Sequence, residues 1–118
     1  MGNCILTKGG MSGGVKLLWT NPNPTSSFGA QTVALDLSKY IFVYILLVPE
    51  GSDTGYVGQL CKIGETQILI SSLVNNSSAF CRVRKVTITT TGLKFQTGYA
   101  GTSGSGDLCK PYKIYGLK

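Results

Sequence analysis

The side chains that could do acid–base chemistry are few in this chain. Its five carboxylates are Asp36, Glu50, Asp53, Glu65 and Asp107, and it contains no histidine. Without an imidazole, neither a Ser-His-Asp site, nor a Cys-His site, nor a zinc site with a histidine ligand can form. Glycoside hydrolysis needs only two carboxylates, but four of the five acids fall in predicted loops or turns. Asp36 lies at a predicted strand end, where acids commonly cap turns. We therefore predict a protein without catalytic residues.

The four cysteines, Cys4, Cys61, Cys81 and Cys109, are the next candidates for chemistry. The nearest two in sequence, Cys61 and Cys81, are 20 positions apart, so no Cys-x-x-Cys pair exists to hold a metal or a redox couple. An even count would permit two disulfides in an oxidising compartment. Residues 1–14 contain no apolar run of the length of a signal peptide, and no stretch approaches the roughly 18 apolar residues of a membrane span. We therefore expect reduced thiols, no metal, no cofactor and no membrane insertion.

Positive charge exceeds negative charge, with a net charge of +6 and a pI near 9.3. Such an excess is common in proteins that neutralise phosphate. Most lysines are scattered singly, however, and the only cluster is Arg82, Arg84 and Lys85. Because Arg82 and Arg84 would share one face of an alternating strand, we expect a solvated stripe there and no nucleic-acid partner.

Aromatic residues near loops are the best candidates for binding, because flat rings stack on sugars and anchor protein partners. These residues are Trp19, Phe28, Tyr40, Tyr56, Tyr99, Tyr112 and Tyr115. Tyr56 and Tyr99 flank glycine-rich segments, and we expect both rings to be exposed. Trp19 ends an apolar run and is expected to pack inside. Together with Arg82 and Arg84, the two tyrosines are the predicted ligand-binding residues.

The surface is expected to be unusually neutral, since charged residues make up 14% of the chain against about a quarter in typical domains. Neutral polar residues and glycine take their place in part. Such a surface loses its water easily, which favours assembly with copies of the chain or with a larger particle. It equally suits a lone β-domain with threonine-rich outer faces.

Apolar segments with the alternation or the β-branched composition of strands recur along the chain, separated by turn residues. We predict strands at residues 15–19, 31–37, 41–48, 56–63, 66–71, 80–90, 93–99 and 108–117. No segment has helical periodicity. The chain is therefore predicted to be all-β, an antiparallel β-sandwich of jelly-roll-like type with about eight strands, and a barrel is the alternative.

One β-sandwich domain is expected at residues 15–118, preceded by a flexible N-terminal arm at residues 1–14, where repeated glycines disfavour order. The composition of residues 75–78 predicts a turn. Residues 100–106 are rich in Gly and Ser and predict a mobile surface loop.

Four local predictions concern individual strands. The continuous apolar run at residues 41–48 predicts a central strand that is buried on both faces. Gly64-Glu65 has the length of a hairpin turn, so we predict that residues 56–63 and 66–71 form a β-hairpin. A change of phase along residues 80–90 predicts a bulge at Arg84-Lys85. Pro111 predicts that the last strand lies near an edge of its sheet.

Two stretches of the chain follow a recognisable pattern. The first is Lys16-Leu17-Leu18-Trp19-Thr20-Asn21-Pro22, then Phe28, Gln31-Thr32-Val33 and Leu35-Asp36-Leu37-Ser38 with Tyr40, and the second is the ending from Cys109 to Lys118. These stretches resemble a module of small structural and tail proteins in phages and prophages of Gram-positive bacteria. The resemblance implies a virion component, assembled in the host bacterial cytoplasm, with a flexible arm joined to a β-rich head. It also implies contacts with other virion proteins and with host cell-surface glycans.

Two functions are therefore open at this point. The first is a non-enzymatic phage virion structural protein, either tail- or fibre-associated or a decoration module, which recognises a host-surface receptor. In that role the chain would be a homo-oligomer, with a trimer favoured. The alternative is a stand-alone carbohydrate- or nucleic-acid-binding β domain that acts in the host cytoplasm through Arg82, Arg84 and Lys85 or through exposed tyrosines.

Overall fold

A computed structural model of the chain describes residues 14–49, 55–74 and 79–118, and at residues 72–74 and 79–80 it describes the backbone alone. Every regular element within these ranges is a β-strand, so the all-β prediction is confirmed. None of the described residues belongs to a helix that is long and apolar enough to cross a membrane. The predicted arm up to residue 13, the predicted turn, Cys4, Glu50 and Asp53 lie outside the described residues.

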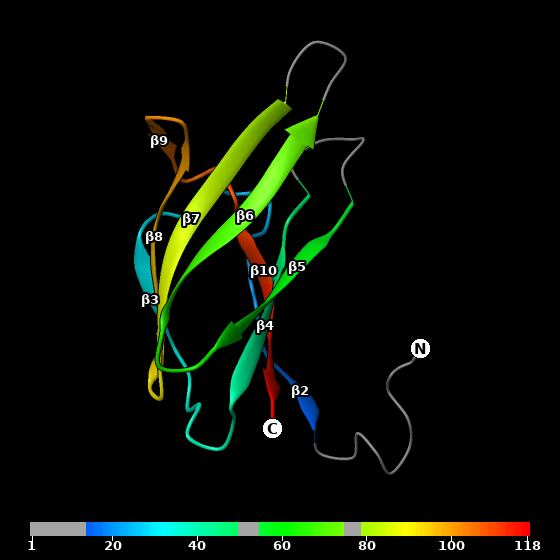
Figure 1. Ribbon diagram of the computed structural model, residues 1–118, viewed down its shortest axis with the longest axis vertical. Coiled ribbons are helices and arrows are strands. Elements are labelled where there is room, and N and C mark those ends of the chain that lie inside the picture. The colour runs from blue at the N-terminus through cyan, green and yellow to red at the C-terminus, as the bar shows by residue number, and fades with distance from the viewer. Residues whose placement is uncertain (1–13, 50–54, 75–78) are drawn as a thin grey trace.

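The nine strands of the described residues form two antiparallel sheets that face each other (Figure 1). The first sheet contains, in spatial order, β2 (Val15–Thr20), β10 (Pro111–Leu117), β4 (Phe42–Leu47) and β5 (Val57–Lys62). The second sheet contains β3 (Gln31–Ala34), β8 (Gly92–Ala100), β7 (Ala79–Thr89) and β6 (Thr66–Val74), and the short strand β9 (Ser103–Ser105) pairs with β8. Each of the eight predicted segments overlaps one of the longer strands.

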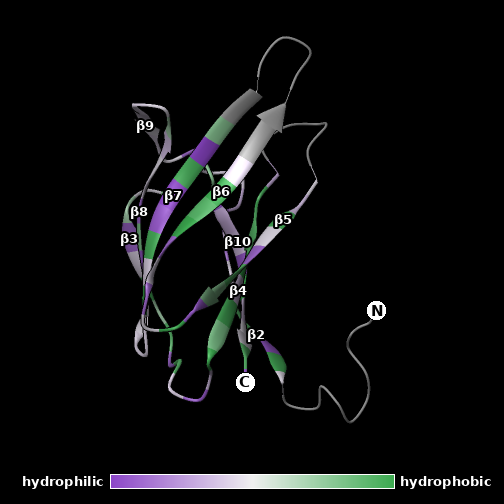
Figure 2. Ribbon diagram, viewed as in Figure 1, coloured by the Kyte–Doolittle hydropathy of each residue, from purple (hydrophilic) through white to green (hydrophobic). Residues whose placement is uncertain are grey.

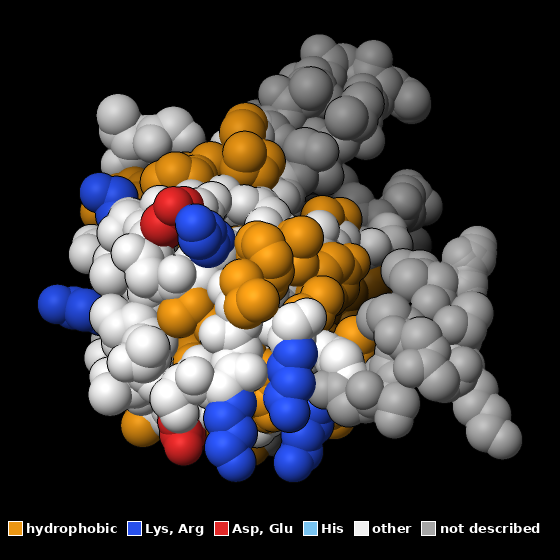
Figure 3. Space-filling model, turned by 60° about the horizontal axis from the view of Figure 1, so that its bottom comes forward, with side chains coloured by type: hydrophobic (Ala, Val, Ile, Leu, Met, Phe, Trp, Pro, Cys, Tyr) orange, Lys and Arg blue, Asp and Glu red, His pale blue; other side chains and the backbone are white. Residues whose placement is uncertain are grey.

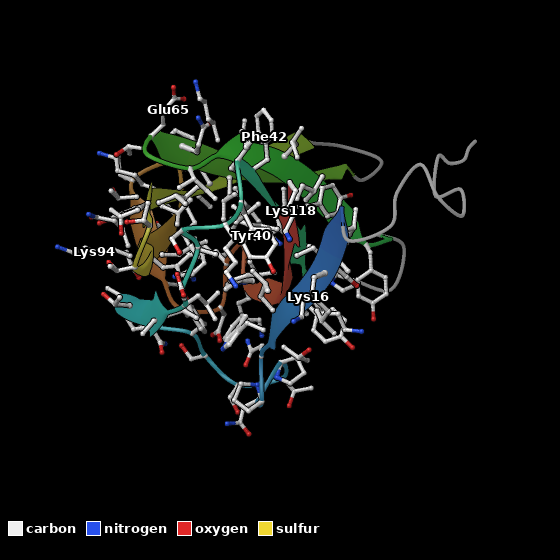
Figure 4. All side chains as sticks on the ribbon, turned by 90° about the horizontal axis from the view of Figure 1, so that it is seen from below. Lys16, Tyr40, Phe42, Glu65, Lys94 and Lys118 are labelled. Atoms are coloured by element: carbon white, nitrogen blue, oxygen red, sulfur yellow. The ribbon has the colours of Figure 1, made fainter. Side chains whose placement is uncertain are left out.

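The core lies between the two sheets and is built by alternation along each strand. Val43, Ile45 and Leu47, for example, point inward from β4. The other buried apolar side chains of this cluster are Phe28, Val33, Leu37, Cys61, Leu69, Val86, Ile88, Leu93, Phe95, Cys109 and Ile114. Tyr40 lies at one end of the space between the sheets (Figure 4), where its ring packs against Gly116.

The turn at Gly64-Glu65 joins strands of different sheets, so the predicted hairpin is wrong. The backbone of this turn forms hydrogen bonds with β7 and not with β5. The Gly64 N–H donates to the Ile88 carbonyl (2.8 Å), and the Ile88 N–H donates to the Glu65 carbonyl (3.0 Å). Pairing with β7 therefore begins in the turn itself, before β6 starts.

A side chain connects the two sheets where β5 and β6 approach each other. Gln59 Nε2 donates to the carbonyl oxygen of Ile68 (2.8 Å), and Gln59 Oε1 accepts a hydrogen bond from the Ile70 N–H (3.3 Å). Both partners lie on β6, which is an edge strand of the second sheet. The carboxamide thus takes the place of a neighbouring strand at this edge.

β10 lies between β2 and β4, so the predicted edge position of this strand is wrong. Pro111 is its first residue, where a missing N–H is tolerated, and the register against β4 shifts between Pro111 and Lys113. The Pro111 carbonyl accepts a hydrogen bond from Asn21 Nδ2 (2.9 Å). The predicted loop at residues 100–106 also differs, because β9 within it pairs with β8.

The register between β7 and β8 shifts between Arg84 and Val86, next to the position of the predicted bulge. Arg84 lies opposite Gly98 and Val86 lies opposite Phe95, so the extra residue belongs to β8. The alternation of β7 itself is continuous, because Arg84, Val86 and Ile88 are all buried. The predicted change of phase in β7 is therefore wrong, and an arginine occupies a core position.

Candidate contact surface

The outer face of the first sheet carries a row of apolar side chains that crosses all four strands. Tyr115 of β10 lies opposite Leu17 of β2 on one side and opposite Tyr44 of β4 on the other, and Tyr44 lies opposite Leu60 of β5. Leu17, Tyr44 and Leu60 are 46%, 36% and 52% exposed. Directly opposite side chains start about 5 Å apart, so the row is continuous.

β4 contributes apolar side chains to both of its faces, as the green colour along much of this strand shows (Figure 2). The prediction of a strand buried on both faces holds only for the inner face. On the outer face Tyr44 is exposed, and Phe42 and Leu46 are half-buried. A strand face that is apolar enough for a core therefore meets solvent in the single chain. We call the following group the tyrosine face: Leu17, Phe42, Tyr44, Leu46, Leu60 and Tyr115.

The ring of Tyr44 lies along the neighbouring strand. It covers Gly58 of β5, where even a single added Cβ atom would overlap the ring. On its other side, the ring centroid of Tyr115 is 6.3 Å from that of Tyr44, with 56° between the ring planes. Gly58 therefore leaves the space in which Tyr44 lies low across the sheet.

A second aromatic group lies beside this face, near the starts of β5 and β10. The rings of Tyr56 and Tyr112 are stacked, with centroids 5.5 Å apart and 24° between their planes. Lys113 Nζ lies 5.1 Å from the centroid of the Tyr112 ring. Lys113 is opposite Leu46 in the sheet, so the aromatic group extends the tyrosine face.

The strands that form this surface contain lysines and no acids. The four strands of the first sheet contain Lys16, Lys62 and Lys113 but no Asp or Glu, and Lys118 follows β10 directly. In Figure 3 hydrophobic side chains form a patch in the middle of the view, with Lys and Arg side chains on its borders. A surface that covers this patch is expected to be apolar at its centre and neutral or acidic at its rim.

The two predicted tyrosines are both exposed, but the structure does not bring them together. Tyr56 is 59% exposed and stacks beside the first sheet. Tyr99 is on β8 of the second sheet, opposite Val83 of β7, which in turn lies opposite Ile70 of β6. The predicted binding residues therefore belong to two separate surfaces.

The predicted solvated stripe is wrong for Arg84, which is 0% exposed, and Arg82 is half-buried. The Arg84 guanidinium lies 5.4 Å from the ring centroid of Phe28. Its N–H groups donate to backbone carbonyls of distant residues: Cys109 (Nε, 3.0 Å), Gln96 (Nη1, 2.6 Å), Leu108 (Nη2, 2.8 Å) and Gly106 (Nη2, 3.3 Å). These donors face the chain itself, so Arg84 holds the segment before β10 against β7 and is not a surface ligand-binding residue.

The described acids occupy turns. Asp36 Oδ1 accepts hydrogen bonds from the Ser38 hydroxyl (2.6 Å) and the Ser38 N–H (3.1 Å), and these bonds lower the pKa of the Asp36 carboxyl. Glu65 Oε1 accepts a hydrogen bond from Gln67 Nε2 (3.1 Å). Within the ranges that the structure describes, no three His, Cys, Asp or Glu side chains gather in a group that could hold a metal ion.

Three of the four cysteines lie in the described residues. No disulfide links Cys61, Cys81 and Cys109 to one another. Cys81 is exposed, whereas the other two are buried. Burial raises the pKa of the Cys61 thiol to about 11, so this thiol is a poor nucleophile at neutral pH.

Of the tyrosine face only Tyr115 was among the aromatic candidates for binding, although the sequence contains a signal for the whole face. Phe42, Tyr44 and Leu46 alternate with three apolar residues of the core, so both faces of β4 need a cover. Among the residues that the structure describes, only the inner face has one. Comparison with known proteins adds no relative: no protein-family model matches the chain, and no curated protein or solved structure is significantly similar to it.

Proposed function

We propose that this chain is a non-enzymatic structural protein that assembles into a closed homo-oligomer through the tyrosine face. The observation that carries the proposal is the row of Leu17, Tyr115, Tyr44 and Leu60 across every strand of the first sheet, in which all but the half-buried Tyr115 are exposed. Full burial of one large apolar side chain contributes about 1.5–3 kcal/mol. Tyrosine is also enriched at protein contacts, because its ring is rigid and its hydroxyl can be hydrogen-bonded at the rim.

The size of the face bears on the kind of interface. Four strands of about six residues span roughly 20 Å by 20 Å, or about 400 Å² in projection. Stable interfaces bury about 800 Å² on each partner. The tyrosine face would therefore be the apolar centre of a larger interface, to which the Tyr56–Tyr112 stack and neighbouring loops would contribute.

The lysines favour a ring over a face-to-face dimer. In a two-fold dimer the same patch occurs on both partners, so the lysine-bearing surface of one copy would face the lysine-bearing surface of the other. Like charges across an interface are unfavourable. In a trimer the tyrosine face of each copy meets a different surface of the next copy, so this repulsion is avoided.

The setting we propose is the particle of a phage, as a tail- or fibre-associated or decoration protein. Support for this setting comes from the resemblance of the two terminal stretches, and from the low content of charged residues, which suits repeated contacts between subunits. Mass spectrometry of purified virions should detect the chain. Its absence from virions of a phage that encodes it would contradict this part of the proposal.

The finer fold assignment is also a proposal. We propose that the two sheets form a jelly-roll-like sandwich, supported by the nested pairing of β2 with β10 and of β3 with β8. In a full jelly roll β4 would pair with β7, whereas here β4–β5 and β6–β7 are neighbours in both sequence and space. An experimental structure of the oligomer would test the strand order.

The decisive experiment measures the mass of the assembly by sedimentation equilibrium. We expect the wild-type chain to be a trimer and the variant Tyr44→Lys to be a folded monomer, because the substitution places a charge at the centre of the face. The matched control is Tyr99→Lys, which changes an exposed tyrosine on the second sheet and should leave the trimer intact. Circular dichroism checks that both variants fold.

Two results would contradict the proposal. One is a wild-type chain that stays monomeric at the highest soluble concentration. The other is a Tyr44→Lys variant that assembles as the wild-type chain does, since the tyrosine face would then not be part of the interface.

A further inference from the structure

The molecule is open on the side opposite the Gln59 contact. β2 and β3 are edge strands of different sheets, and residues 21–30 connect them. A pocket of about 390 Å³ lies there, lined by Trp19, by residues 21–23 and 26–28, and by β3. We call it the edge pocket. Small-ligand sites typically measure about 300–1,000 Å³, so the edge pocket is large enough for one sugar-sized group.

One wall of the edge pocket is an aromatic ring whose position is fixed by a chain of contacts. The ring of Trp19 meets the ring of Phe28 edge-on, with centroids 6.1 Å apart and 70° between the planes. Phe28 in turn packs at 90° on the buried Phe95, with centroids 5.4 Å apart, and under the guanidinium of Arg84. A ring supported in this way loses little freedom when a ligand stacks on it.

The loop that forms the opposite wall is also fixed. Buried Asn21 donates through Nδ2 to the Pro111 carbonyl (2.9 Å) and accepts through Oδ1 from the Asn23 N–H (2.9 Å). The Ser26 N–H closes a turn on the Asn23 carbonyl (3.0 Å), and the Phe28 N–H donates to the Gly106 carbonyl (2.9 Å). The edge pocket is therefore preformed, which lowers the entropy loss on binding.

The polar groups of the edge pocket are uncharged, because none of the described residues that line it is ionisable. Gln31 lies opposite Phe95, which is buried, so its carboxamide projects toward the space between the sheets. Gln31 Nε2 makes only a long contact with the Gly29 carbonyl (3.3 Å). The carboxamide of exposed Asn23 adds a further donor and acceptor. One cation lies near the rim, where Lys110 Nζ is 3.4 Å from the Ser26 carbonyl.

We infer that the edge pocket binds an uncharged sugar residue of a glycan. A sugar presents an apolar C–H face that stacks on an indole and hydroxyls that exchange hydrogen bonds with carboxamides. A purely apolar ligand would leave the carboxamides unpaired. A phosphorylated or acidic ligand would need more cations than the single rim lysine. The inference does not depend on assembly through the tyrosine face.

Tryptophan fluorescence reports on the edge pocket directly, since Trp19 lines it and is the only tryptophan of the chain. We would titrate the full chain with neutral oligosaccharides of glucose, galactose and N-acetylglucosamine and follow tryptophan fluorescence. At least one should give a saturable change, with an affinity that stays constant as salt is raised, because no charge is screened. The substitution Gln31→Met keeps the length of the side chain, and should weaken binding about fivefold through the loss of one hydrogen bond.

The matched control is Gln96→Met, which changes an exposed glutamine of β8 that does not line the edge pocket. It should bind the sugar as the wild-type chain does. Tyr44→Lys should also retain sugar binding, which separates failure of this inference from failure of the assembly proposal. The inference is overturned if no neutral sugar changes the fluorescence, if only acidic sugars bind with steep salt dependence, or if Gln31→Met binds as tightly as wild type.

Discussion

Arg84 Nε donates a hydrogen bond to the carbonyl oxygen of Cys109 at 3.0 Å, which joins the middle of β7 to the segment that leads into β10. Arg84 donates to three further carbonyl oxygens, at 2.6, 2.8 and 3.3 Å. The charge of the arginine is thus matched by backbone dipoles inside the fold. Loss of these donors would leave carbonyl groups buried without partners, which is more costly than loss of an exposed bond.

Arg84→Lys should destabilise the fold by about 3 kcal/mol, because an ammonium group cannot reach four carbonyls in the geometry of a guanidinium. Urea denaturation followed by circular dichroism measures the change. Lys85→Ala, at the exposed neighbouring position, should change the free energy of unfolding by less than about 0.5 kcal/mol. Similar stabilities for the two variants would show that Arg84 does not hold this segment.

Gly92→Ala should destabilise the chain by about 2 kcal/mol. Gly92 begins β8 with a φ of +150°, and an added Cβ would overlap the Val33 carbonyl of β3. Gly29→Ala is the control, since an added Cβ there meets no atom within 4 Å. Thermal unfolding should give a clearly lower midpoint for the first variant alone, and equal midpoints would contradict the close approach of β3 to β8.

Gly58→Ala should weaken assembly while the fold persists. The new methyl group would overlap the Tyr44 ring and lift it from the sheet, which would disturb the centre of the tyrosine face. Gly55→Ala, where the added atom has open space, should assemble normally. Sedimentation equilibrium compares the two, and an unchanged oligomer in Gly58→Ala would argue against a role for the Tyr44 ring.

Thiol reactivity should follow burial. In a Cys4→Ser background, which removes the cysteine outside the described residues, iodoacetamide at mildly alkaline pH should label Cys81 rapidly. Cys61 and Cys109 should react only after denaturation, because they are buried and the pKa of Cys61 is raised. Peptide mapping by mass spectrometry identifies the labelled sites. Rapid native labelling of Cys61 would contradict its burial in the core.

The raised pKa of Cys61 also predicts a pH dependence. Its value is about 11 in the folded chain against 9.0 for an ordinary cysteine. Between these values the unfolded chain loses the thiol proton while the folded chain keeps it, so stability is full below pH 9 and falls as pH rises toward 11. Denaturation across this range should show a smaller fall for Cys61→Ala than for Cys81→Ala. Equal slopes would contradict the prediction.

The strands were predictable because their pattern is local. Alternation and turn residues located all eight longer strands, but they could not show which strands share a sheet. Gly64-Glu65 has the length of a hairpin turn in sequence, and only the distant Ile88 reveals that the turn pairs with β7. Pro111 likewise looks like an edge residue until the side chain of Asn21 and a register shift accommodate it within the sheet.

The site was less predictable than the fold. From the sequence alone Arg84 resembles a surface residue, because the four carbonyl groups that accept its hydrogen bonds lie 12 to 25 positions away along the chain. Tyr56 and Tyr99 were correctly expected to be exposed, but their places on different surfaces follow from strand order. Tyr44 and Tyr115 become neighbours only when β10 inserts beside β4, and no local pattern encodes that insertion.

The Gln59 contact has a consequence for how the protein could misassemble. Sheet edges with unpaired N–H and C=O groups can recruit strands from other molecules and grow into fibrils. Gln59 occupies the Ile68 carbonyl and the Ile70 N–H on one side of the molecule, whereas β2 and β3 on the other side have no such cover from within the described chain. Polymerisation by strand recruitment should therefore begin at β2 or β3, and loss of the carboxamide in Gln59→Leu should open a second growing end.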